Sequence, residues 1–200
     1  MSKFYICMDI SSKCTGYSIV EVSNKTLIFK EIGALFRPIT WTESGKYYKY
    51  LIDFIVDKCS SKAYNIEKIV AEAYFVSPFK GSGTSVVVEA IGSVKASCYF
   101  PKPSLEFESI APQTWRSMLD IKKDDTLKGS ARFKVPTKTK IESLLNLTFP
   151  EQTFDILGNK FRKTPTDLVD AVGIAMGFFK KTQGITTYNM ESNAIKLKND

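Results

Sequence analysis

The chain has 200 residues, of which 44% are hydrophobic and 24% charged, an ordinary balance for a globular protein that buries one core without disulfides. Its formal net charge of +7 suits a polyanionic partner such as a nucleic acid, although many basic proteins bind none. The lack of histidine excludes Cys₂His₂ zinc fingers, Ser-His-Asp triads and nucleases that depend on a histidine base.

The cysteines and the apolar segments indicate the class of protein. Cys7, Cys59 and Cys98 lie in apolar or helical runs without C-x-x-C spacing, so we interpret them as reduced core thiols. No segment reaches the length of a membrane span, and the opening MSKFYICMDI lacks the pattern of a signal peptide. We therefore expect an intracellular, soluble protein with no membrane partner.

The first third of the chain predicts three strands, a helix and a fourth strand. Residues 3–9, 15–22 and 26–35 are rich in β-formers, and the short links between them indicate an antiparallel meander. The apolar period then changes to that of an amphipathic helix over 43–61. A short apolar strand follows and ends at Glu72.

The rest of the chain is mainly helical by pattern. We expect a helix over 84–100, a fifth strand over 105–110, a short helix over 112–119 and an exposed loop over 120–135. Pro136 suits the first position of the next helix, and 148–164 is irregular. A final helix over 165–181 is apolar nearly all round and therefore buried. The pattern predicts a single domain over 1–181 and a mobile tail over 182–200.

The order β-β-β-α-β-α-β, followed by helices, predicts an α/β fold of the ribonuclease H-like type. Such a fold has a mixed five-stranded sheet, in which three antiparallel strands are followed by parallel additions, with helices flanking it. Folds of this kind commonly place their chemistry at the ends of strands.

Acidic residues occupy those positions. Asp9 and Glu72 follow apolar strands, while Asp167 and Asp170 share one face of the last helix. Asp9 could instead cap the turn in DISSKCTG, and the helix pair could stabilise the positive end of its helix. Carboxylates gathered in an apolar setting repel one another unless a cation joins them, and hard oxygen ligands suit Mg²⁺ or Mn²⁺. In a basic chain this pattern favours phosphodiester chemistry on a nucleic acid.

Three segments in this order resemble the RuvC family of Holliday junction resolvases, within the ribonuclease H-like nucleases. They are MDISSKCTGYSIV, IVAEAYF and TDLVDAVGIAM, and the likeness extends more weakly through APQTW and the helix after Pro136. The chain departs from the family at Asp9-Ile10-Ser11, where the family has D-P-G, and in its long 120–135 loop. Such departures are typical of a divergent member, for example from a virus or phage.

The resemblance implies a Mg²⁺-dependent endodeoxyribonuclease that resolves four-way junctions and related branched DNA in recombination and repair. It implies two Mg²⁺ ions, replaceable by Mn²⁺, and hydrolysis that leaves a 5′-phosphate and a 3′-hydroxyl. It also implies a homodimer, which the apolar face of the 84–100 helix favours. The catalytic and metal-binding residues are then Asp9, Glu72, Asp167 and Asp170.

DNA contacts are expected from basic residues between 113 and 163 and from the segment after Glu72. Lys138 is the best single candidate, because its helix corresponds to a DNA-contacting region of the family. Phe75 corresponds to the family's aromatic residue and would stack at the branch, unless it is a core side chain. The predicted DNA-binding residues are Phe75, Lys80, Arg116, Lys134, Lys138 and Lys140.

Three other functions compete with this interpretation. An actin-like or sugar-kinase ATPase also opens with Asp, a tight turn and Gly, but it needs a second domain for which 200 residues leave no room. A non-catalytic module that binds branched DNA would not need four carboxylates. A ribonuclease H acting on RNA–DNA hybrids is the nearest alternative, and the late D-x-x-D-A helix favours the resolvase.

Overall fold

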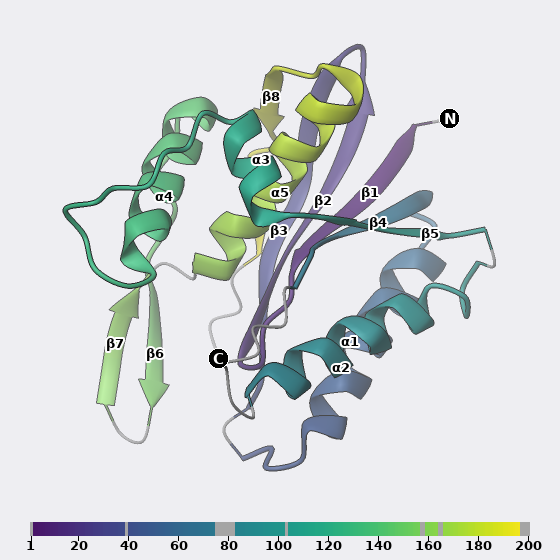
Figure 1. Cartoon of the computed structure of the whole chain (residues 1–200). Coiled ribbons are helices and arrows are strands. Elements are labelled where there is room, and N and C mark those ends of the chain that lie inside the picture. The colour runs from purple at the N-terminus through teal and green to yellow at the C-terminus, as the bar shows by residue number, and fades with distance from the viewer. Residues whose placement is uncertain are drawn as a thin grey trace.

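A computed structural model describes residues 2–38, 40–74, 83–102, 104–156, 159–163 and 166–196. Its centre is one twisted mixed sheet of seven strands in the order β5-β4-β1-β2-β3-β8, with β9 also pairing β3 (Figure 1). The five strands predicted from the sequence are β1 (Lys3–Asp9), β2 (Cys14–Ser23), β3 (Thr26–Phe36), β4 (Ile66–Glu72) and β5 (Glu106–Ile110).

The strand directions confirm the predicted ribonuclease H-like fold. β1, β2 and β3 form an antiparallel meander, and β4 and then β5 are added in parallel beyond β1. Side chains that alternate along β1 enter two cores, one on each side of the sheet. Tyr5 and Cys7 belong to the first core, and Ile6 and Met8 belong to the second.

The sheet has two strands more than predicted. β8 (Thr187–Met190) and β9 (Ile195–Lys196) both pair in parallel with β3 and extend the sheet beyond the meander. The expectation of a mobile tail over 182–200 is therefore wrong for the part that the structure describes, 182–196. Strands this short carry almost no period of their own, so the sequence pattern did not reveal them.

Helices cover both faces of the sheet (Figure 1). α1 (Ser44–Ser60) and α2 (Gly83–Ser97) pack on one face with the second core. α3 (Pro112–Met118), α4 (Ala131–Leu145) and α5 (Thr166–Gln183) lie on the other with the first core. α5 is buried from Leu168 to Phe179, because the sheet lies on one side of it and α3 and α4 on the other, as its apolar sequence predicted.

α4 begins earlier than predicted. Ala131 is its first residue, so Pro136 lies inside the helix and not at its first position. A proline has no N–H to bond the carbonyl four residues earlier, which here belongs to Arg132. That carbonyl oxygen accepts instead from the backbone N–H of Asp124, at 2.9 Å. The loop before α4 thus supplies the donor that Pro136 lacks.

The segment expected to be irregular contains a hairpin. β6 (Gln152–Ile156) and β7 (Asn159–Lys163) pair antiparallel as a separate two-stranded sheet. Figure 1 shows this hairpin projecting away from the central sheet, beyond one end of α4. It directly precedes α5, which carries two of the predicted site residues. Among the described residues, no helix is both long and apolar enough to span a membrane.

Candidate active site

Asp9 and Glu72 reach the same edge of the sheet because their strands run in parallel. β1 and β4 are neighbours, and Met8 is paired with Ala71. The next residue on each strand is the acidic one, so the two carboxylates end adjacent strands. The apolar residues before them anchor both strands in the cores, which leaves Asp9 and Glu72 partly exposed at the rim.

Gly16 brings the first turn of α5 to the same edge. It lies opposite Asp9 in the β1–β2 pair. A Cβ atom at this position would collide with the backbone carbonyl of Asp167. The missing side chain therefore allows α5 to approach β2 closely, and the two aspartates of its first turn arrive beside Asp9.

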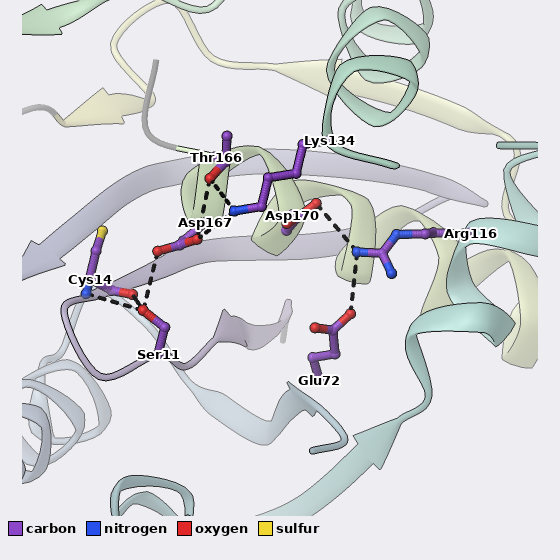
Figure 2. A network of polar contacts seen from close by, with 8 residues as sticks. All are labelled: Ser11, Cys14, Glu72, Arg116, Lys134, Thr166, Asp167 and Asp170. Atoms are coloured by element: carbon purple, nitrogen blue, oxygen red, sulfur yellow. Dashed lines mark hydrogen bonds and ion pairs between the residues drawn. The ribbon is translucent and has the colours of Figure 1, made fainter. Parts of the chain in front are cut away.

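The aspartates of α5 differ in exposure. Asp170 is only 4% exposed, whereas Asp167 is less deeply buried, and Leu168 and Val169 between them are core residues. The Ser11 hydroxyl donates a hydrogen bond to Asp167 Oδ2 at 3.3 Å, which ties the β1–β2 turn to the helix (Figure 2). The four predicted carboxylates thus come from two strand ends and one helix start.

The pKa values indicate that these carboxylates share one electrostatic environment. Burial raises the pKa of Asp9 well above its usual range, and the negative charges of the other three carboxylates raise it further. Burial raises the pKa of Asp170 to about 7, although the Arg116 guanidinium opposes the shift. Burial also raises the pKa of Glu72, against a hydrogen bond from Trp115. Ionising all four carboxylates at once is therefore unfavourable unless a cation neutralises part of their charge.

Two cationic side chains enter the cluster (Figure 2). Arg116 Nη2 lies 3.6 Å from Glu72 Oε1 and 3.8 Å from Asp170 Oδ1, between the sheet edge and α5. On the other side, Lys134 Nζ lies 3.7 Å from Asp167 Oδ1. Among the described residues, four carboxylates meet two cations, so the formal charge of this part of the site is negative even though the chain is basic.

The donor set fits a divalent cation in its chemistry. Asp9, Glu72, Asp167 and Asp170 offer only carboxylate oxygens, the hard ligands that Mg²⁺ and Mn²⁺ prefer. Within the described residues, no three His, Cys, Asp or Glu side chains are arranged so that they could hold a metal ion as they stand. Because like charges repel, the carboxylates are expected to draw closer around a cation.

The predicted DNA-binding residues fall into four groups. Arg116 and Lys134 lie inside the acidic cluster and pair with its carboxylates. Lys138 lies one turn beyond Lys134 on the same face of α4 and pairs with Glu142 at 3.7 Å. Lys140 lies on a different side of α4, where it lines a depression together with residues of the 120–124 loop. Phe75 and Lys80 lie outside the described residues.

Other side chains of the site were not predicted from the sequence. Trp115 Nε1 donates a hydrogen bond to Glu72 Oε1 at 2.9 Å, and the Trp115 ring is fully buried. Thr166 Oγ1 accepts a hydrogen bond from Lys134 Nζ at 2.7 Å, and Ser11 bonds Asp167. A buried tryptophan needs an acceptor for its N–H, so Trp115 in APQTW was the one detectable signal.

Solved structures of Holliday junction resolvases share this fold. RuvC of Thermus thermophilus aligns with a TM-score of 0.61 and 14% identity, over 91% of this chain and 97% of that one. The yeast mitochondrial Holliday junction resolvase aligns with a TM-score of 0.56 and 14% identity, over 88% of this chain and 78% of that one. The fowlpox virus Holliday junction resolvase aligns with a TM-score of 0.54 and 14% identity, over 89% of this chain and 99% of that one. No family model and no curated protein sequence matches the chain.

Proposed function

We propose that this chain is a metal-dependent endodeoxyribonuclease that cleaves branched DNA, chiefly four-way junctions. The observation that carries the proposal is the convergence of Asp9, Glu72, Asp167 and Asp170 at one rim of a ribonuclease H-like sheet. The resolvases with a similar fold support the substrate class, since the solved structures include complexes of Thermus thermophilus RuvC and of the fowlpox resolvase with junction DNA.

The four carboxylates would hold Mg²⁺, or Mn²⁺ in its place. When bound, such ions supply Lewis-acid stabilisation of a phosphodiester and a water of lowered pKa, which removes the need for a histidine base. Asp9 is central to the site, because its pKa responds to the charges of Glu72, Asp167 and Asp170 together. The products expected from this chemistry are a 5′-phosphate and a 3′-hydroxyl.

The protein's own residues position the ligands and the substrate. Trp115 orients Glu72 through its indole N–H, and Ser11 orients Asp167. On α4, Lys134 and Lys138 form a cationic face that continues outward from the acidic rim. Because phosphate contacts depend on charge and not on base identity, this face would hold a strand by its backbone while the carboxylates face the scissile bond.

A homodimer is part of the proposal, because two symmetric strands of a junction require two active sites. The apolar face of α2 that suggested this assembly belongs to the chain's own core, where Ala90 and Val94 are fully buried. The support comes instead from large apolar side chains left exposed on and after α2, namely Val88, Tyr99 and Phe100. Light scattering at micromolar concentration tests the assembly, and a strict monomer that makes paired cuts would contradict it.

Cleavage assays test the activity directly. Labelled four-way junction, flap, linear duplex and RNA–DNA hybrid would be incubated with Mg²⁺, with Mn²⁺ and with EDTA. We expect cleavage of the junction with either metal, none with EDTA, and none after Asp9→Asn or Asp170→Asn, while both variants still bind the junction. Wild-type cutting by either variant would overturn the site, and preference for the hybrid would favour a ribonuclease H.

A further inference from the structure

Arg116 occupies the acidic cluster without forming a close ion pair. Its Nη2 lies 3.6 Å from Glu72 Oε1 and 3.8 Å from Asp170 Oδ1, so it approaches both carboxylates but exceeds the usual hydrogen-bond length to each. The Nε atom of the same side chain is buried and, among the described residues, finds no hydrogen-bond partner. Unpaired buried donors are rare in proteins and call for an explanation.

Aromatic rings flank this guanidinium. It lies 4.4 Å from the centre of the Trp115 ring and 5.6 Å from that of Phe133. Cation–π contacts of this kind attract the charge without using its N–H donors. The Arg116 side chain is 17% exposed, and its Nη2 is held by the two carboxylates only at long distance, so its terminal nitrogens can reach a ligand at the rim.

Lys134, the other cation of the cluster, is held differently. Its ammonium donates a hydrogen bond of 2.7 Å to Thr166 Oγ1 in addition to its pairing with Asp167. This bond ties Lys134 to the first residue of α5, whereas Arg116 has only long contacts to its two carboxylates. Figure 2 shows Arg116 joined to Glu72 and Asp170, and Lys134 joined to Thr166 and Asp167. Because both contacts of Arg116 exceed hydrogen-bond length, a competing ion would displace it from the carboxylates more easily than Lys134.

We propose that Arg116 is a resident counter-cation that a divalent ion displaces from Glu72 and Asp170, and that the released guanidinium then binds a DNA phosphate. This inference rests on the proposed function. The carboxylates that Arg116 approaches are two of the four expected metal ligands, and its positive charge would repel an ion that they share. The planar guanidinium can donate two parallel hydrogen bonds to a pair of phosphate oxygens. Its contacts with the carboxylates are too long to be such hydrogen bonds.

A consequence of displacement is coupling between the two ligands. If the metal ion frees Arg116 for DNA, then DNA must raise the affinity for the metal by the same factor, because linkage is reciprocal. In the absence of DNA, the metal ion must compete with Arg116 for the carboxylates. It therefore binds less tightly than it would to the same carboxylates without Arg116. Arg116 would thus weaken metal binding in the free protein and favour loading on the substrate.

The first experiment measures metal affinity without DNA. Ca²⁺, a hard cation that prefers oxygen ligands, would be titrated into wild type and Arg116→Met by calorimetry. We expect the variant to bind Ca²⁺ about tenfold more tightly, a typical size for coupling between sites. Arg132→Met is the matched control. Arg132 Nε is likewise buried without a hydrogen-bond partner among the described residues, but its guanidinium pairs with the exposed Asp125 outside the cluster, so the variant's affinity should equal that of wild type. Equal or weaker binding by Arg116→Met would overturn displacement.

The second experiment measures junction binding in EDTA and in Ca²⁺. Neutralising the carboxylates strengthens DNA binding in every variant, so the informative quantity is the ratio of the two affinities. We expect this ratio to be several-fold larger for wild type and Arg132→Met than for Arg116→Met. Arg116→Lys should give an intermediate ratio and serves if the methionine variant does not fold.

The junction-binding measurements distinguish failure of this inference from failure of the proposed function on which it rests. An equal ratio in wild type and in the folded Arg116 variants would overturn the release of Arg116 to DNA while leaving the nuclease proposal intact. If wild type binds no branched DNA under either condition, the proposed function fails together with the coupling. The Ca²⁺ titration alone then still decides whether Arg116 competes with the metal.

Discussion

Asp9 and Gly16 face each other across β1 and β2, and this pairing sets how closely α5 approaches the sheet. Asp9 supplies a charge that the site needs, and Gly16 supplies space that no other residue type leaves. The eight residues from Asp9 to Gly16 therefore act as one unit, in which a turn separates the carboxylate from the position where the helix backbone passes.

Gly16→Ala tests this close approach. The added methyl group would meet the Asp167 carbonyl and push α5 away from β2, so we expect a loss of about 1–3 kcal/mol in the free energy of unfolding. Cleavage should fall as well, because Asp167 and Asp170 would shift. Urea denaturation measures the stability. Gly92→Ala on α2 is the control, since its Cβ meets nothing within 4 Å, and it should stabilise the protein by about 0.5–1 kcal/mol. Equal effects at the two glycines would contradict the argument.

At the scale of the elements, short-range sequence signals failed where a partner far along the chain supplied the missing interaction. α4 continues through Pro136 because the 120–130 loop returns a backbone N–H to the carbonyl of Arg132. β8 and β9 form because the edge of β3 is open to them. Both features depend on contacts that a local pattern does not contain.

Pro136→Ala distinguishes this arrangement from an ordinary helix interior. Removing a proline from a helix interior typically stabilises it by about 3 kcal/mol. Here the Arg132 carbonyl already has a donor in Asp124 N–H, so the alanine N–H gains little, and we expect less than about 1 kcal/mol. Thermal or urea unfolding measures the difference. A stabilisation near 3 kcal/mol would mean that the loop contact contributes nothing.

Ile185→Ala tests whether the segment after α5 belongs to the folded core. Ile185 is 2% exposed and lies in the first core between α5 and β8. We expect the free energy of unfolding to fall by about 2–5 kcal/mol, the usual loss for a large aliphatic side chain in a core. The neighbouring Thr186 is exposed, so Thr186→Ala should change it by less than about 0.5 kcal/mol. A neutral Ile185→Ala would restore the expectation of a mobile tail.

At the scale of the whole molecule, the charge is unevenly distributed. The chain carries a formal charge of +7, yet four carboxylates converge at one rim of the sheet, where the described part of the chain places two cations among them. A basic body attracts a polyanion over distance, while an acidic rim attracts divalent cations. This separation is consistent with a protein that binds DNA broadly and performs metal-dependent chemistry at one place.

Lys138→Ala tests the cationic face of α4. Junction affinity should fall steeply as salt rises, because each neutralised phosphate releases counterions. Loss of one phosphate contact should reduce the slope of log affinity against log salt by about 0.9, equally for all branched substrates. Lys49→Ala is the matched control, since Lys49 lies on α1, across the sheet from α4, and likewise pairs with an acidic residue one turn on, and its slope should match wild type. Equal slopes for both variants and wild type would remove this face from the DNA interface.

The sequence by itself determined the fold class and the four acidic positions. Runs of apolar, β-forming residues separated by short turns specify β1 to β3, and such runs are typical of strands buried on both faces of a sheet. A helix apolar all round, such as α5, can only be buried, so Asp170 near its start was predicted to face the core, where the structure buries it. These are local rules, so they were readable before any contact was known.

Only the tertiary structure decided which cations enter the acidic rim. Arg116 and Lys134 were predicted as DNA contacts from their position in the sequence, but packing places them against Glu72, Asp170 and Asp167. The choice depends on where α3 and α4 pack against α5, and long flexible side chains follow charges that come from distant segments. Charge pairing between remote parts of a chain has no period in the sequence. These ion pairs could therefore be recognised only after the fold had brought the partners together.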